Sequence, residues 1–328
     1  MSIKSVELKK DILKARPNLK PRSIDQYASQ LYRLQKMFDA EVYSSDFNFL
    51  GDFNKVKKGL SQFNYLSQRN FVNAIIVLLM ALNLNEVLID QYVKLRDKFN
   101  DEYNETNLSG IISDKQAPNF TTSEEIFRML DMMKNDLKDT DETNLSKKEK
   151  QLLQAFVLFS IYARYPLRND VAGMKSITAG KFNKLNDKDK TENNFLIVER
   201  NRMYFLLNDY KTNKNYGALE IDIKDKELKS ILKNWIKVQN YVGGYGTLFK
   251  TSTDKPITRI ELSKIFLKYS EKYLNKKIST NLLRKIYLSS KYAQEDGLVD
   301  QLKNLEADNE VMMHSKDVAL NVYIKKPQ

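Results

Sequence analysis

Apolar positions in the first hundred residues recur at helical spacing. The segment 21–34 places its apolar side chains on one face every three or four residues, with Ser23 in position to cap a helix. Behind Ser67, the run FVNAIIVLLMAL is apolar on nearly every side, which is typical of a helix at the centre of a domain. A third amphipathic helix is predicted over 86–103. The pattern predicts a small helical domain.

Helical periodicity is lost at residues 105–120, where Gly110 and Pro118 interrupt a polar stretch. We interpret this stretch as a linker between a helical domain at 1–104 and a second domain at 121–328. A chain of 328 residues is long enough to give each domain its own core.

Two capping-box patterns open the second domain. Thr122 with Glu125 and Ser146 with Glu149 each precede an apolar-periodic segment, and the polar stretch 139–146 between the two segments is a predicted loop. Later helices are predicted near residues 226–240, 259–273, 280–293, 297–308 and 316–324.

Three short runs rich in β-formers interrupt the helical pattern. The runs 195–199, 202–208 and 216–223 are separated by Asn, Lys and Gly, which predicts a small antiparallel three-stranded sheet. The charged stretch 183–194 before them is a predicted mobile loop. YVGGYG at 241–246 lacks the Gly-Lys-Ser/Thr ending of a phosphate loop, so we interpret it as a turn. The predicted fold class is mainly α with one small sheet.

Charge favours an anionic partner. Lys and Arg number 54 against 42 Asp and Glu, a net charge of +12, which suits nucleic acid through counterion release but also fits a solvated lysine-rich surface. The absence of Cys excludes disulfides and thiolate sites, and a single His disfavours a histidine-based metal site. The longest apolar run, 74–82, is far shorter than the ~20 residues of a membrane span. We expect a soluble intracellular protein, in the cytoplasm or nucleus of a host cell or in a virion.

Five dispersed side chains suggest chemistry on a phosphodiester. His314 is the only histidine, Tyr323 follows it by nine residues, and Arg168, Lys211 and Arg284 precede it. Two arginines can clamp the non-bridging oxygens of a phosphate, a lysine can protonate the leaving oxygen, and a tyrosine can attack phosphorus. Each residue also has an ordinary interpretation: a structural histidine, a packing tyrosine, an arginine paired with Asp170, a solvated turn lysine near Lys214, and a surface arginine beside Lys285.

The segments around these residues resemble motifs of the tyrosine recombinases, the phage-integrase family. YPLRNDVAGMK resembles the first-arginine box as it occurs in recombinases of giant viruses, virophages and related mobile elements. DYKTNKNYG resembles the turn that holds the catalytic lysine, TNLLRKIY the second-arginine box, and HSKDVALNVY the closing box with its tyrosine. Residues 160–328 resemble the catalytic domain of the family, and residues 1–104 its core-binding domain.

The resemblance implies an activity and its residues. Arg168, Arg284 and His314 would bind the scissile phosphate, Lys211 would protonate the 5′-oxygen, and Tyr323 would form a 3′-phosphotyrosyl link, without metal, cofactor or ATP. The two domains would close a C-shaped clamp on double-stranded DNA. Four subunits would act together on DNA, and the free protein would be a monomer or weak dimer.

The sequence departs from the family pattern in several places. Asn281 stands where the second-arginine box usually has a histidine, and an amide can donate to a phosphate oxygen but does not titrate. Asp170 follows the first arginine by two positions rather than three, and is expected to support Arg168. Only five residues follow Tyr323. The alternatives are a type IB topoisomerase and a catalytically weakened DNA-binding protein of the same fold.

Overall fold

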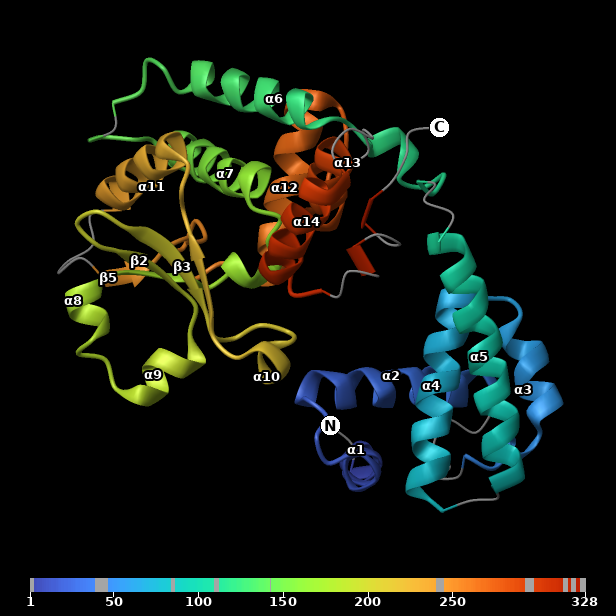
Figure 1. Cartoon of the computed structure of the whole chain (residues 1–328). Helices are drawn as coiled ribbons and strands as arrows, with labels where there is room; N and C mark the ends of the chain where they lie inside the picture. Colours follow the sequence, from blue (N-terminus) through green and yellow to red (C-terminus); the bar gives the residue numbers. More distant parts are fainter. Residues whose placement is uncertain are drawn as a thin grey trace. The chain divides into compact units, whose positions relative to one another are not determined.

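The chain forms two compact units, Met1–Ser109 and Gly110–Gln328 (Figure 1). The computed structural model describes residues 3–38, 47–83, 86–108, 112–141, 143–239, 245–292, 298–314, 318–319 and 323–324. No helix among them is long and apolar enough to cross a membrane. Residues 112–120, part of the predicted linker, belong to the second unit: Lys276 donates to the carbonyl of Phe120, and Lys285 donates to Gln116.

The first unit is helical, as the apolar pattern predicts. Its long apolar helix α4 packs against α1, α2 and α5, and its side chains are buried on most sides. The helices are α1 (Ile3–Ala15), α2 (Pro21–Phe38), α3 (Phe53–Leu60), α4 (Tyr65–Ala81) and α5 (Glu86–Leu108), with a 3₁₀ turn at Asn48–Gly51.

Both predicted caps in the first unit are wrong. Pro21 is itself the first residue of α2, because proline fits the first helical turn, so Ser23 lies inside the helix. At α4, the Asn64 side chain accepts a hydrogen bond from the backbone N–H of Ser67, so Asn64 is the cap.

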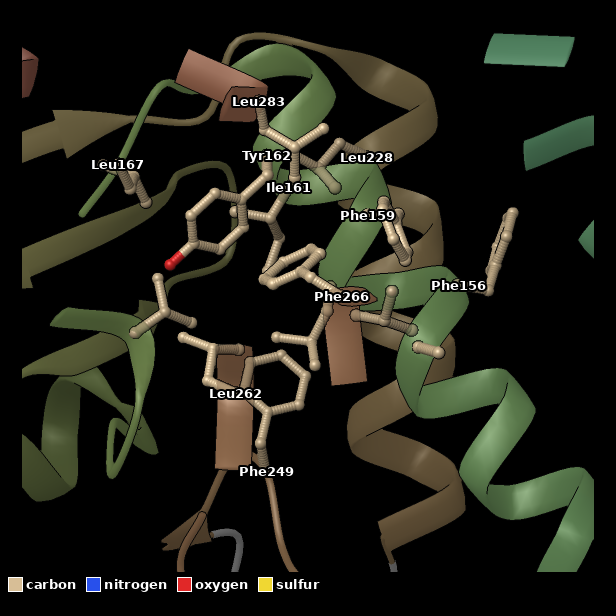
Figure 2. Packing of buried hydrophobic residues seen from close by; sticks show 14 of the residues in the cluster. Phe156, Phe159, Ile161, Tyr162, Leu167, Leu228, Phe249, Leu262, Phe266 and Leu283 are labelled. Atoms are coloured by element: carbon tan, nitrogen blue, oxygen red, sulfur yellow. The ribbon is translucent and has the colours of Figure 1, made fainter. Parts of the chain in front are cut away.

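The second unit is built around helix α7. Its longer helices, within the described residues, are α6 (Ser123–Asp136), α7 (Lys147–Arg164), α11 (Lys226–Gln239), α12 (Arg259–Leu274), α13 (Thr280–Tyr292) and α14 (Leu298–Met312). α7 contacts α6, α11, α12 and α13. In the core, Phe159 and Tyr162 both meet the ring of Phe266 edge-on at 4.7 Å between centroids (Figure 2). The predicted helix at 316–324 lies mostly outside the described residues.

Only one of the two predicted capping boxes is complete. Ser146 and Glu149 exchange both hydrogen bonds at the start of α7. Thr122 accepts from the backbone N–H of Glu125, but the Glu125 carboxylate bonds Thr121 instead of closing the box.

The sheet is mixed and has five strands in the order β4-β3-β2-β1-β5. The predicted antiparallel trio is confirmed as β2 (Phe195–Val198), β3 (Met203–Leu207) and β4 (Leu219–Asp222). The prediction missed β1 (Lys175–Thr178), which runs parallel to β2, and β5 (Tyr245–Thr247), which runs antiparallel to β1. Both strands are short and pair with distant segments, so they carry little local signal.

Two predicted irregular segments contain regular structure. Within 183–194, Asn186 caps the short helix α9 (Asp187–Glu192) by accepting from the backbone N–H of Asp189. Tyr245 and Gly246, predicted as part of a turn, belong to β5, whereas 241–244 lie outside the described residues. Two further short helices are α8 (Ala179–Phe182) and α10 (Asn213–Tyr216).

Candidate active site

Arg168 and Arg284 are brought together by the end of α7. Tyr165 leaves α7 in an extended conformation, and the Tyr162 hydroxyl donates to the carbonyl of Arg168 at 2.6 Å, which fixes the turn after the helix. On α13, Nε of Arg284 donates to the carbonyl of Pro166 at 3.1 Å. The second arginine therefore holds the backbone that carries the first.

Arg284 is almost fully buried, with 5% of its surface exposed. Its Nη1 donates to the Tyr323 hydroxyl at 3.0 Å, and its Nη2 donates to the carbonyl of Met312 at 3.4 Å. Among the described residues no carboxylate pairs with it. Burial lowers the pKa of Arg284, and the charge of Arg168 acts in the same direction. A buried cation with neutral partners favours an incoming anion.

Arg168 contacts the segment that follows α14. Its Nη2 donates to the carbonyl of Met313 at 3.0 Å and lies 2.9 Å from Nδ1 of His314. Its Nη1 is buried and has no hydrogen-bond partner in the part of the chain that is described. A buried donor without an acceptor is costly, so this nitrogen is available to an oxygen supplied from outside.

His314 lies between Arg168 and Tyr323. Nη2 of Arg168 lies 2.9 Å from Nδ1 and 3.2 Å from Nε2. Because arginine only donates, we assign the shorter contact as the hydrogen bond, with Nδ1 as its acceptor and the ring proton on Nε2. That nitrogen lies 2.8 Å from the Tyr323 hydroxyl oxygen. Burial lowers the pKa of His314 to about 3, and the charges of Arg168, Arg284 and Lys211 add to the effect. The imidazole is therefore neutral at physiological pH.

Tyr323 is buried, with 7% of its surface exposed, and packs with Leu288, Leu305 and Met312. Its oxygen can accept from both Arg284 and His314. A phenolate formed there would keep both hydrogen bonds, one of them from the Arg284 guanidinium group, which is the setting that a tyrosine nucleophile needs.

Lys211 lies on the β3–β4 connection and its side chain is exposed. The neighbouring Thr212 hydroxyl donates to the carbonyl of Met313 at 3.4 Å, which holds the turn beside the backbone of His314. The charge of Lys211 is felt at His314, where it contributes to the lowered pKa. Lys214 is also exposed, on α10.

Two predicted site residues stand apart from this cluster. Asn281 is exposed on α13, three residues before Arg284, and its side chain makes no hydrogen bond within the described residues. Asp170 is buried, but its ion pair is with Arg259 at 2.9 Å rather than with Arg168. Burial raises the pKa of Asp170, and its second oxygen has no hydrogen-bond partner among the described residues.

Sequence reasoning missed Arg259 and Asn194. Arg259 opens α12 behind the Thr258 capping box, and pairs with Asp170 across 89 positions of sequence. Asn194 is a buried residue in a stretch predicted to be a mobile loop. The capping box marks the start of α12, but no local signal identifies either side chain's partners.

The site combines a cationic cradle, formed by the guanidinium groups of Arg168 and Arg284, with the buried phenol of Tyr323. Nη1 of Arg284 and Nε2 of His314 lie within hydrogen-bond distance of the Tyr323 oxygen, and Arg168 contacts the same imidazole. Among the described residues, no group of three or more His, Asp and Glu has the arrangement of a metal site. Such a cluster can bind a phosphodiester and attack its phosphorus.

The fold is similar to that of several solved structures. No protein-family model matches the chain, and no match was found among curated protein sequences. The Tn1549 transposon integrase in complex with circular intermediate DNA is similar at TM-score 0.55 and 16% identity, over 100% of this chain and 97% of that chain. The XerH site-specific recombinase bound to palindromic difH substrate is similar at TM-score 0.52 and 16% identity, over 96% and 79%.

A second complex of the Tn1549 integrase, with transposon right end DNA, gives TM-score 0.54 and 15% identity over 98% of this chain and 95% of that chain. These neighbours are site-specific recombinases and integrases solved with DNA. The chain has the tyrosine recombinase fold, mostly helical with one small sheet, which confirms the predicted fold class.

Proposed function

We propose that this protein is a site-specific DNA recombinase or integrase that cuts and rejoins duplex DNA through a 3′-phosphotyrosyl intermediate, without metal or ATP. One observation carries the proposal: the Tyr323 oxygen lies 3.0 Å from Nη1 of Arg284 and 2.8 Å from Nε2 of His314, which itself contacts Arg168. The fold it shares with DNA-bound recombinases and integrases adds support.

In the proposed cleavage, the scissile phosphate enters the cradle and its non-bridging oxygens accept from Arg168 and Arg284. The orphaned Nη1 of Arg168 gains an acceptor in this complex. Tyr323 loses its proton to water, its oxygen bonds to phosphorus, and the bond from phosphorus to the 5′-oxygen breaks. The arginines stabilise the charge that grows on the phosphoryl oxygens.

Lys211 is proposed to give a proton to the departing 5′-oxygen. Its exposed side chain on the β3–β4 connection can reach toward bound DNA. The phosphotyrosyl ester retains the energy of the broken bond, so a 5′-hydroxyl can attack it and rejoin a strand without ATP. Asn281 is a proposed phosphate donor, because an exposed amide one turn from Arg284 suits that role.

We further propose that the two domains clamp duplex DNA and that four subunits exchange strands. The net charge of +12 favours contact with the phosphate backbone. The first-arginine segment, with its resemblance to recombinases of giant viruses and virophages, favours a mobile-element setting.

Covalent capture tests the proposal. The full-length protein is mixed with a pool of random-sequence duplexes in a chelating buffer without ATP, the mixture is denatured, and DNA bound to protein is sequenced. Wild type should capture DNA through a defined sequence, and Tyr323→Phe should capture none. Equal capture by both proteins, or binding without any capture by wild type, would exclude this mechanism and leave a DNA-binding role.

A further inference from the structure

The amide of Asn194 uses its full hydrogen-bonding capacity inside the second unit. Its Nδ2 donates to the carbonyls of Asp170 and Asp209, both at 2.9 Å. Its Oδ1 accepts from the backbone N–H groups of Asn208 and Asp209, both at 2.8 Å. Only 7% of Asn194 is exposed. Such a buried amide, satisfied at every position, fixes the backbone segments that it joins.

Both of those segments lead to the candidate active site. Asp170 lies two residues after Arg168, and Asp209 lies two residues before Lys211. The partly exposed side chain of Arg259 also lies near both aspartates. Its Nη2 is 2.9 Å from the carboxylate of Asp170 and 4.0 Å from that of Asp209. One amide and one guanidinium therefore bridge the same two segments.

The turn with Lys211 depends on such supports. Lys211 is exposed, and its long side chain has many rotamers, so the backbone beneath it sets where its ammonium group can reach. The Asn213 side chain donates to the carbonyl of Asn208 at 2.7 Å, and Thr212 contacts Met313. The Asn213 bond shapes the turn internally, and the Thr212 bond ties the turn to the segment before His314. Asn194 and Arg259 tie the start of the turn to the Arg168 segment.

We propose that Asn194 and Arg259 are positioning residues that hold the Lys211 turn in register with Arg168. This inference rests on the proposed function: a phosphate bound by Arg168 would have its 5′-oxygen within reach of Lys211 only while the two segments keep their spacing. Neither residue touches the reacting atoms. Their loss would impair proton donation specifically, and leave the phosphate clamp and Tyr323 in place.

A change of leaving group isolates proton donation. In normal DNA, the bond from phosphorus to the 5′-oxygen breaks and that oxygen takes a proton from Lys211. With sulfur at the 5′-bridging position, the bond from phosphorus to sulfur breaks and a stable thiolate leaves without a proton. We therefore compare the rate of adduct formation on the sulfur substrate with the rate on the oxygen substrate. The sulfur-to-oxygen rate ratio rises when a protein variant loses general-acid catalysis.

The experiment uses the duplex recovered by covalent capture, made with oxygen or with sulfur at the cleaved position. Asn194→Leu removes all four side-chain hydrogen bonds at similar volume. Arg259→Gln removes the guanidinium bridge at a side chain that is 45% exposed, and keeps an amide that can donate to the buried Asp170 carboxylate. Lys211→Ala is the reference for complete loss. Gln154→Leu is the matched control, because Gln154 is equally buried and accepts from the backbone of Lys250, away from the cluster.

We expect the sulfur-to-oxygen ratio to rise about tenfold for Asn194→Leu and Arg259→Gln, and about a hundredfold for Lys211→Ala. Gln154→Leu should keep the wild-type ratio. Wild-type adduct formation with an unchanged ratio in Arg259→Gln and in folded Asn194→Leu would overturn the positioning role alone. The absence of any wild-type adduct would overturn the proposed function, and this inference with it.

Discussion

Arg284 contacts Tyr323 twice with one guanidinium group. Its Nη1 donates to the tyrosine hydroxyl at 3.0 Å, and its central carbon lies 4.5 Å from the centroid of the tyrosine ring. These residues are separated by 39 positions in the sequence. The candidate nucleophile is therefore held at both its ring and its oxygen by the candidate phosphate ligand of the same chain.

This double contact predicts how Tyr323→Phe behaves in DNA binding. Phenylalanine keeps the ring over the guanidinium and removes only the hydroxyl, which frees Nη1 of Arg284 for phosphate. Affinity for the captured duplex should remain within about threefold of wild type, because the phosphate clamp is intact. Fluorescence anisotropy at fixed salt measures it, and a loss of affinity far beyond that range would show that the hydroxyl serves binding or folding.

The lowered pKa of His314 predicts a pH-dependent cost to folding. The folded pKa is about 3 and the ordinary value is 6.5, so between these pH values the unfolded chain binds a proton that the folded chain does not. The free energy of unfolding should therefore rise with pH through this window, by at most about 1.4 kcal/mol per pH unit from this group. Urea titrations of wild type and His314→Gln measure the difference. An equal pH dependence in the two proteins would contradict a neutral imidazole in the folded protein.

The raised pKa of Asp170 predicts that removing its charge will stabilise the folded protein. Burial raises its pKa, so its charge at neutral pH opposes folding, and the opposition disappears in acid, where the carboxyl group is protonated in both states. The substitution Asp170→Asn removes the charge and keeps an oxygen that can accept from Arg259. We expect Tm at pH 7 to rise by about 3 °C, the shift for roughly 1 kcal/mol in a domain of this size.

The control for this effect is Asp222→Asn, at an exposed carboxylate that pairs with Arg202 on the sheet. Its Tm should not rise, because a solvated carboxylate carries little desolvation cost. A fall in Tm for Asp170→Asn at pH 7 would mean that the ion pair with Arg259 outweighs the burial of the charge.

The orphaned donor of Arg168 predicts specific stabilisation by inorganic phosphate. Phosphate supplies the oxygen that Nη1 lacks, so Tm should rise with the logarithm of phosphate concentration, relative to chloride at equal ionic strength. Arg168→Lys should lose this rise, and Arg202→Lys, at a partly exposed side chain in the turn before β3, should keep it. An identical rise in all three proteins would indicate a general salt effect on the surface.

Arg168, Arg284, His314 and Tyr323 can be predicted from the sequence because each lies in a short segment with a recognisable motif. Arg168 lies two residues after Pro166, just beyond the end of α7. Arg284 lies on an amphipathic helix, and His314 is the only histidine of the chain. Their order suggested convergence, and the structure brings both arginines, His314 and Tyr323 into contact.

The supporting network was not predictable in the same way. Arg259 and Asn194 act through partners that only the tertiary fold brings near, and a charged loop such as 183–194 gives no sign of the buried amide at its end. The parallel strand β1 was not predicted for the same reason. It has only four residues, and its pairing with β2 is set by the tertiary fold rather than by a local apolar pattern. Local patterns predict elements, whereas non-local polar contacts depend on the completed fold.

The most direct test of the central claim is to identify the amino acid that carries DNA. Wild-type adduct formed with the captured duplex in chelating buffer is digested with nuclease and protease, and the modified peptide is sequenced by mass spectrometry. We predict a nucleotide joined through its 3′-phosphate to the oxygen of Tyr323. A nucleotide on any other residue, or a 5′-phosphate linkage, would contradict the account.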